Sequence, residues 1–592
     1  VGSEMCIRDS INTTLRLNYD LSSLLTKGLS VHGSIAYDSY YYSRKKYSKT
    51  FPYYLARRDA EDPDYIYLIP QSEESIWSVS TGWDKNRKVY MEFGIDYNRT
   101  FGLHKTTALI LYNQSKYYSP SLQYYVPNAY QGLVGRLTYE YASRYLAEFN
   151  MGYNGTENFA KGKRFGFFPA VSLGWVISEE KFFPKNNIVK YLKVRGSYGE
   201  VGNDQIGGDR FLYLPSSYGA ASDSGVNKYN FGLASNPYTS LMIVENKIGN
   251  PDLTWEKAKK MNVGVDINLF NNCLTASFDI FKEKRNNILA NRSTSPMIIG
   301  ANLPAYNFGE MENRGWEMDL NFRHHIQDFH YWARFNYSFA RNEIIYMDEV
   351  QKRYDYQMTT GRRKNQFFGL IFDGYYNSWE EINALDRPKS SWSGNQLQPG
   401  DVKYIDVNQD GVIDDYDMVP IGYTPVPEII YGFSFGAQYK GFDFSILFQG
   451  ADNVSIKYFG RSMWPFAKGE ESAKSLIKER WTQERYEAGE KITFPRLSLN
   501  PNGETDHNYR PSTLWIRDAS YLRLKNLEVG YTFTGGFVKR LNLNSVRLYF
   551  NGSNLFTWTD VVDLDPEAPS RSGNVEINTY PLQKVYNICL LY

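Results

Sequence analysis

Apolar and polar residues alternate along much of this chain. Between residues 261 and 269 every second residue is apolar, and the residues between them are polar or small. The alternation restarts at residues 274–280, after a turn that we place at Asn271-Asn272. Since successive side chains of a β-strand point to opposite faces, the two stretches predict a hairpin with one apolar and one polar face. The pattern recurs at residues 89–97, 316–322, 331–339, 433–439 and 442–448, and it predicts roughly 16 to 18 strands in the chain.

The connections between the predicted strands fall into two length classes. We expect tight turns near residues 101–104, 271–272, 324–329 and 440–441, and long polar loops at about 201–255, 345–428 and 452–512. This inequality is typical of a transmembrane antiparallel β-barrel with short periplasmic turns and long extracellular loops. A soluble propeller or a string of sandwiches is the alternative, but no repeat of about 40 to 50 residues is visible. The predicted fold class is therefore all-β, with one short helix expected at residues 470–486.

The composition agrees with strands that have two different faces. Aromatic residues make up 16% of the 592 residues, yet the mean hydropathy is −0.51, which suits strands with one face toward lipid and one toward water. A transmembrane helix needs a run of about 18 apolar residues, and the sequence has no run of that length. The chain has 66 basic and 65 acidic residues, so we expect no nucleic-acid partner held by bulk charge.

Residues 406–417 carry the sharpest chemical signal in the chain. Oxygen side chains stand at the first, third, fifth, ninth and twelfth positions of a calcium-type loop, and Gly411 stands at the turn position. The predicted ligands are Asp406, Asn408, Asp410, Val412 through its backbone carbonyl, Asp414 and Asp417. The pattern predicts a structural Ca²⁺ that fixes a long loop. The alternative is a solvated acidic turn, because Asp and Asn favour turns without any metal.

Other candidate sites are weaker. Aromatic residues expected in or near loops could stack on sugar rings or peptide side chains, or could belong to the interfacial girdle of a barrel. They are Tyr40, Tyr41, Tyr42, Tyr124, Tyr125, Trp379, Trp392 and Trp464. His324-His325 is placed in a short turn and is not read as a metal pair. No nucleophile elbow or phosphate-binding loop is present, so we expect no enzyme and assign no substrate-binding residue.

Both ends of the sequence look foreign to the pattern. Residues 1–10 and the tail at 589–592 are predicted to be non-native, which leaves residues 11–588 as the C-terminal part of a barrel domain. Cys6 and Cys589 fall in these ends, so Cys273 stands alone and no disulfide framework is expected.

A series of short motifs runs in order along most of the chain. They are Arg144–Leu146, Asn154–Phe159, Arg164–Ala170, Ser172–Trp175, Arg195–Gly199 with Gly202-Asn203, Asn250–Lys257, Glu312–Glu317, Gly374–Tyr376, Phe494–Leu497, Ser520–Asn526, Asn554–Thr557 and Tyr580–Leu582. Together with the calcium-type loop, this series resembles the SusC/RagA family of TonB-linked outer-membrane proteins.

The resemblance implies a function and a set of partners. It implies a barrel larger than this chain with an N-terminal plug, which the chain is expected to lack. It also implies import of oligosaccharides or peptides across the outer membrane of a Gram-negative cell. The implied partners are a SusD-like surface lipoprotein, outer-membrane lipid, and the TonB complex through the missing N-terminal region. Two alternatives stay open, a passive outer-membrane porin and a cell-surface β-rich glycan-binding protein.

Overall fold

The computed structural model describes most of the chain. The described residues are 2–591 without 59–60, 63, 123–124, 206–209, 216–218, 221–227, 234–237, 245–247, 295–302, 393–396, 459–463, 467–474, 499–505, 541–542, 563, 568–573 and 576–581. Some features expected from the sequence lie outside these residues, namely Val1, Tyr124, residues 470–474, Tyr580-Pro581 and Tyr592.

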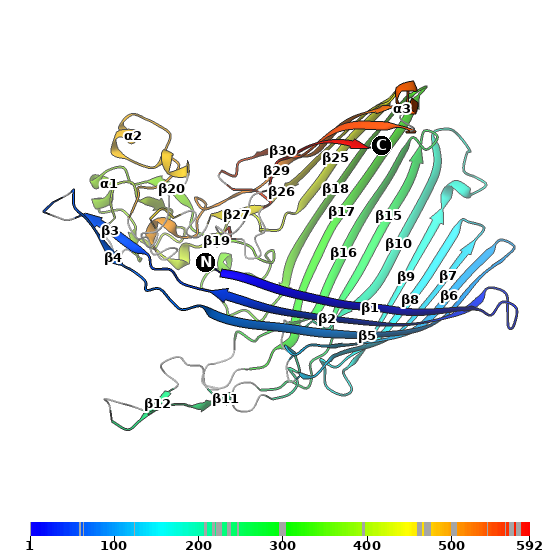
Figure 1. The fold of residues 1–592 in the computed structure, drawn as a ribbon, viewed down its shortest axis with the longest axis horizontal. Helices are drawn as coiled ribbons and strands as arrows, with labels where there is room; N and C mark the ends of the chain where they lie inside the picture. The colour runs from blue at the N-terminus through cyan, green and yellow to red at the C-terminus, as the bar shows by residue number, and fades with distance from the viewer. Residues whose placement is uncertain are drawn as a thin grey trace. The chain divides into compact units, whose positions relative to one another are not determined.

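Long antiparallel strands dominate the described part of the chain (Figure 1). Seventeen of them form one sheet, which confirms the predicted strand number. They are β1 (Gly2–Asp20), β2 (Leu29–Ser48), β5 (Ser78–Phe101), β6 (His104–Tyr118), β7 (Asn128–Tyr141), β8 (Tyr145–Thr156), β9 (Phe165–Val176), β10 (Val189–Asn203), β15 (Glu256–Leu269), β16 (Leu274–Ala290), β17 (Tyr306–Ile326), β18 (Phe329–Tyr346), β25 (Ile429–Tyr439), β26 (Phe442–Asp452), β29 (Tyr521–Phe533), β30 (Val546–Thr559) and β32 (Val585–Leu591).

The chain divides into two compact units. The first contains residues up to 172 together with 199–255, and its strands pair in the order β1, β2, β5, β6, β7 and β8. The second contains residues 173–198 and those from 256 onward, and its strands pair in the order β15, β16, β17, β18, β25, β26, β29, β30 and β32. Each strand therefore lies beside a neighbour in sequence, as in an up-and-down meander.

Alternation sets the two faces of these strands. On β16, the side chain of Ile280 is 56% exposed and lies in a row with Val263 and Trp316 of the neighbouring strands. Asp279 points to the other face, where its side chain is only 15% exposed. One face is thus an apolar surface without cover, and the other holds charged groups in contact with one another.

The tight turns lie where the sequence predicts them, and one of them is longer than predicted. Lys440 and Gly441 connect β25 to β26 with φ angles of 44° and 91°, the left-handed values that a two-residue hairpin turn requires. The predicted turn at Asn271-Asn272 is instead four residues long, because β15 ends at Leu269 and β16 begins at Leu274. Phe270 also takes a positive φ of 52°, which widens the connection.

Several residues expected in turns or loops lie in strands. His324 and His325 belong to β17, since the pairing with β18 continues up to Ile326. Tyr40, Tyr41 and Tyr42 belong to β2, which stays paired with β1 and β5 as far as Ser48. The turn prediction for His324-His325 was wrong, because β17 and β18 stay paired beyond the apolar centre that the alternation indicates. Residues 2–10 and 589–591 also lie in strands, β1 and β32, so their non-native origin stays a prediction.

The long segments of the second unit contain a hydrophobic core of their own, which we call the loop core. Its buried residues come from 370–413 and 454–561 and include Trp481, Phe494 and Trp515. The segments were predicted to be polar, but their apolar residues follow no period and so escape a rule based on alternation. In Figure 1 the short elements of this region gather beyond the end of β26.

The short elements complete the described structure. Those in the long segments of the second unit are β19 (Phe368–Gly369), β20 (Phe372–Tyr375), α1 (Trp379–Asn383), β21 (Lys389–Ser390), β22 (Val402–Tyr404), β23 (Val412–Ile413), β24 (Val419–Pro420), β27 (Ser455–Tyr458), α2 (Gln483–Glu487) and β28 (Ile516–Asp518). The others are β3 (Tyr54–Arg58), β4 (Ile66–Pro70), β11 (Gly219–Ala220), β12 (Lys228–Phe231), β13 (Tyr238–Leu241), β14 (Ile243–Val244), α3 (Gly536–Arg540) and β31 (Asn574–Val575).

The predicted helix at 470–486 is interrupted where it is described. A 3₁₀ turn covers Ser475–Glu479, and α2 starts only at Gln483. Between them Trp481 is buried in the loop core and its backbone N–H donates to Phe494 O at 2.8 Å. Within the described ranges, no helix is long and apolar enough to cross a membrane.

Candidate functional site

The predicted calcium loop, residues 406–417, lies between β22 and β24. Its eighth residue, Ile413, is buried in the loop core. Val412 and Ile413 form β23, which pairs in parallel with Lys389 and Ser390 of β21. The loop is thus attached to the loop core by one apolar side chain and one short pair of strands.

Asp406 has one satisfied and one unsatisfied oxygen. Its Oδ2 accepts a hydrogen bond from the Gly411 N–H at 2.8 Å, and the φ of +83° at Gly411 permits the turn that makes this bond possible. Its Oδ1 is buried and has no hydrogen-bond partner among the described residues. A buried carboxylate oxygen without a donor is unfavourable unless a cation lies close to it.

Asp417 is the most deeply placed acid of the loop. Its side chain is 0% exposed, and its oxygens accept hydrogen bonds from the N–H groups of Val407 at 2.8 Å and Asp414 at 2.9 Å. Burial raises the pKa of this carboxyl, and the nearby charge of Asp406 adds to the rise. A cation between the two carboxylates would relieve both effects.

The remaining predicted ligands bind mainly to the loop's own backbone. Asn408 Oδ1 accepts from the Asp410 N–H, Asp410 Oδ1 from the Val412 N–H, and Asp414 Oδ1 from the Tyr416 N–H. In the part of the chain that is described, no three His, Cys, Asp or Glu side chains form a group arranged to hold a metal ion. Coordination by all six predicted residues therefore stays a prediction. The geometry supports Asp406 most strongly, because its buried Oδ1 has no hydrogen-bond donor among the described residues.

A segment that sequence reasoning missed fixes the end of the loop. Tyr356 donates its hydroxyl to Tyr416 O at 2.7 Å, and Gln357 Nε2 donates to Asp415 O at 2.8 Å. The Arg353 guanidinium lies 4.9 Å from the centre of the Tyr416 ring. These contacts join residues about sixty positions apart, and no local pattern indicates them.

His507 connects β21, the strand that pairs with the calcium-type loop, to β22, which belongs to the loop core. Its Nε2 lies 2.8 Å from Val402 O, and its Nδ1 lies 3.1 Å from the Ser390 hydroxyl. Because a carbonyl only accepts, Nε2 carries the proton of the neutral ring and Nδ1 accepts from Ser390. Burial lowers the pKa of His507, although Asp401 and Asp506 oppose this effect and Arg510 adds to it.

Acidification is expected to loosen this connection. The folded-state pKa lies below the ordinary value, so the stabilisation is complete above that value and is lost as the pH falls toward the folded-state pKa. The protection factor of the Val402 amide, which corrects its exchange rate for the intrinsic pH dependence of exchange, should therefore fall in a step when the pH is lowered through the ordinary imidazole range. The His507→Gln variant keeps an N–H donor but cannot titrate, and its protection factor should lack this step. An equal step in both proteins would contradict the prediction.

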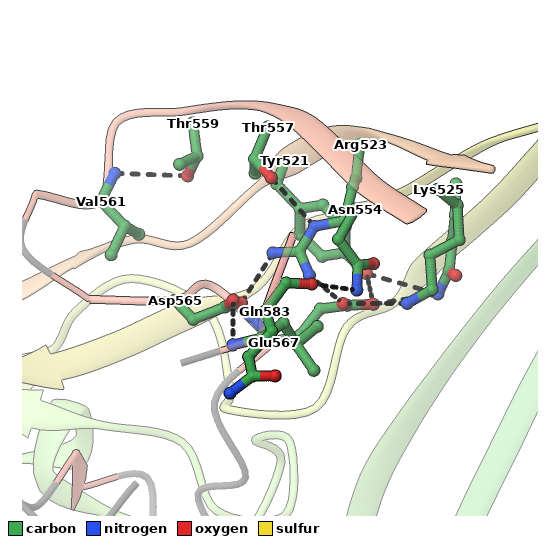
Figure 2. A network of polar contacts seen from close by, with 12 residues as sticks. Tyr521, Arg523, Lys525, Asn554, Thr557, Thr559, Val561, Asp565, Glu567 and Gln583 are labelled. Carbon is green, nitrogen blue, oxygen red and sulfur yellow. Dashed lines mark hydrogen bonds and ion pairs between the residues drawn. The ribbon is translucent and has the colours of Figure 1, made fainter. Parts of the chain in front are cut away.

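Arg523 of β29 is a second buried site that the sequence did not reveal. Its side chain is 2% exposed and donates to Asp565 Oδ1 at 2.7 Å and to Glu567 Oε2 at 2.6 Å (Figure 2). Tyr521 and Lys525, on the same face of β29, also bind Glu567, at 2.6 Å and 3.2 Å. The network fixes the chain that follows β30 against β29.

Comparison with known proteins decides the family. The family described as "TonB dependent receptor-like, beta-barrel" matches residues 6–555, which is most of the chain. The chain belongs to this family of TonB-dependent receptors. The match confirms the predicted all-β barrel class, and the family consists of receptors and transporters rather than enzymes.

Individual relatives support the SusC/RagA resemblance. TonB-dependent receptor P3 of Formosa agariphila is 29% identical over 450 residues, which is 74% of this chain and 42% of that protein. TonB-dependent receptor SusC of Bacteroides thetaiotaomicron is 28% identical over 464 residues, 77% of this chain and 43% of that protein. The chain spans less than half the length of these curated relatives.

A solved structure shares the fold. The structure titled "Structure of the RagAB peptide transporter" superposes with a TM-score of 0.72 and 19% identity, covering 100% of this chain and 62% of that one. Proteins of this family are β-barrels of the outer membrane, so the uncovered apolar face of the strands faces lipid.

The opposite, polar face carries rows of ion pairs. Arg195 of β10 binds Asp279 at 2.7 Å and Asp266 at 3.1 Å, and these acids come from β16 and β15. Further along the second unit, Arg547 of β30 binds Asp443 and also Glu528, the latter at 2.6 Å. Each arginine links three strands on the face that a barrel turns toward its interior.

Proposed function

We propose that the whole protein is a TonB-dependent nutrient importer of the SusC type in the outer membrane. The observation that carries this proposal is the family match over residues 6–555, on strands with an apolar face and an ion-paired face. The proposed cargo is an oligosaccharide or a peptide, since one relative is SusC and one structural neighbour is titled a peptide transporter. In this proposal the present chain supplies barrel wall and outer loops.

The proposal includes two protein partners. A SusD-like lipoprotein would cover the outer loops, and TonB would supply energy through a part of the protein outside this chain. The loop core supports the first of these, because long loops with a packed core present a fixed surface instead of a set of independent flexible segments.

The 406–417 loop is proposed to hold a structural Ca²⁺. Asp406, Asn408, Asp410, Asp414 and Asp417 would supply side-chain oxygens and Val412 its carbonyl, since calcium prefers hard oxygen ligands in this spacing. The ion would supply a positive charge beside the buried Asp417 carboxylate and the buried Oδ1 of Asp406. The loop would then hold the loop core in one arrangement where a partner docks.

Uptake measured in cells tests the import function. A strain lacking the gene, complemented with the full-length gene, is expected to accumulate labelled oligosaccharides or peptides, and accumulation should fall to background when TonB is also removed. The same lipoprotein should co-purify with the protein before and after TonB removal. Uptake that persists without TonB would instead indicate a passive porin. Recovery of the protein in the soluble fraction would indicate a surface glycan-binding protein.

A further inference from the structure

Two histidines face each other near the short turn between β17 and β18. His325 and His330 are direct cross-strand partners, and the turn between the strands is Gln327-Asp328. Their ring centroids lie 5.6 Å apart with an interplanar angle of 25°. Both residues are exposed, so an ion in solution can reach the pair.

The adjacent His324 has a different environment. Its partner on β18 is Tyr331, whose hydroxyl lies 3.3 Å from His324 Nδ1. His324 precedes His325 on β17, and the centroids of these two rings lie 6.1 Å apart with an interplanar angle of 27°. His325 and His330 differ from His324 in standing directly opposite each other across the two strands, whereas His324 stands opposite Tyr331.

The spacing of the two rings suits a shared metal ion. A metal–nitrogen bond of about 2.0–2.1 Å places each ring centroid about 3.2 Å from the ion, so two ligands at an angle near tetrahedral have centroids about 5 to 5.6 Å apart. The observed 5.6 Å agrees with this range. Simple offset packing of two rings reaches the same separation, and only a binding experiment separates the two explanations.

We propose that His325 and His330 form an open site for a divalent transition-metal ion such as Zn²⁺, Ni²⁺ or Cu²⁺. Imidazole nitrogens are ligands that these ions prefer over the hard cations Ca²⁺ and Mg²⁺. No third His, Cys, Asp or Glu completes a metal-holding group here or elsewhere among the described residues, so water fills the remaining positions. Gln438 of β25 is the cross-strand partner of His330 and adds a polar neighbour on the same row. The site is independent of the calcium loop and of the import function.

Metal titration of matched variants tests the site. The full-length protein in detergent, stripped of metal, is titrated with Zn²⁺ in a calorimeter at neutral pH. We expect it to bind one ion more than the H325A/H330A double variant, and the single variants to bind that ion at least tenfold more weakly. The His324→Ala variant, altered at the next position of the same hairpin, should bind like the unchanged protein, because the His324 ring is placed against the Tyr331 hydroxyl and not opposite His330. Each variant is first shown to be folded by its heat-dependent migration in gel electrophoresis.

Spectroscopy with Cu²⁺ gives an independent readout of the ligands. The electron paramagnetic resonance spectrum of the bound ion should show two imidazole nitrogens, and one in His330→Ala. Equal Zn²⁺ binding by the unchanged protein and the double variant would overturn the proposal and leave a packed pair of rings. A loss of equal size in His324→Ala would also overturn it, because the effect would then come from the hairpin and not from the pair.

Discussion

Replacing Arg523 with alanine is expected to destabilise the protein by about 3–5 kcal/mol, the usual loss when one partner of a buried ion pair is removed. The arginine is 2% exposed and is the main cation between Asp565 and Glu567. Without it, two largely buried carboxylates lose their shared cation, and Glu567 keeps Lys525 Nζ at 3.2 Å and the neutral Tyr521 hydroxyl at 2.6 Å. The chain that follows β30 should then detach from β29.

Equilibrium unfolding in urea and limited proteolysis measure this loss. The Arg523→Ala variant should unfold at a lower urea concentration and should be cut after β30, where the unchanged protein resists. Arg136→Ala is the matched control, because Arg136 is likewise a strand arginine paired with an acid, Glu148, but its side chain is 53% exposed. That variant should lose no more than about 1 kcal/mol.

A compensating variant distinguishes unpaired charge from lost packing. Adding Asp565→Asn and Glu567→Gln to Arg523→Ala removes the carboxylates that have no counterion, so part of the stability should return. If the triple variant were as unstable as the single one, packing of the arginine stem would account for the loss. A single variant no less stable than Arg136→Ala would show that the network contributes little.

The strands could be predicted from the sequence because their signal is local. The period of two is imposed by the strand itself, so Val263, Ile280 and Trp316 indicate one face before any pairing is known. The calcium loop was visible for the same reason, since its ligands lie within twelve residues. The ends of the strands were harder to predict from the sequence. His325 was placed in a turn because the alternation of apolar residues stops before the backbone pairing of β17 with β18 ends.

The loop core and the Arg523 network could not be predicted because their partners are distant in sequence. Phe494 and Trp515 pack with Leu370, and nothing in the local pattern connects them. Arg523 lies 42 residues from Asp565, in a chain with 66 basic and 65 acidic residues, so chance pairs hide the real one. The family motif Ser520–Asn526 marked the position of Arg523 but did not indicate its partners.

Replacing Asp417 with alanine is expected to abolish calcium protection of the 406–417 loop and to weaken the loop even without calcium. The side chain accepts hydrogen bonds from the N–H groups of Val407 and Asp414, and each buried donor left unpaired costs about 1–3 kcal/mol. Limited proteolysis of the full-length protein with calcium or with a chelator measures both effects. The unchanged protein should be cut in the loop at least tenfold more slowly with calcium, and the variant equally fast in both conditions.

Two further variants separate metal binding from backbone support. Asp406→Asn keeps an oxygen that can accept from the Gly411 N–H, but it removes the charge, so it should lose calcium protection and keep the protection seen with chelator. Asp415→Ala changes an exposed acid of the same loop outside the predicted ligand positions, and it should behave like the unchanged protein. Calcium protection that survives in Asp406→Asn would show that Asp406 Oδ1, the buried oxygen without a donor, is not a ligand. If calcium protected neither the unchanged protein nor Asp406→Asn, the loop would be an acidic turn held by its own backbone hydrogen bonds.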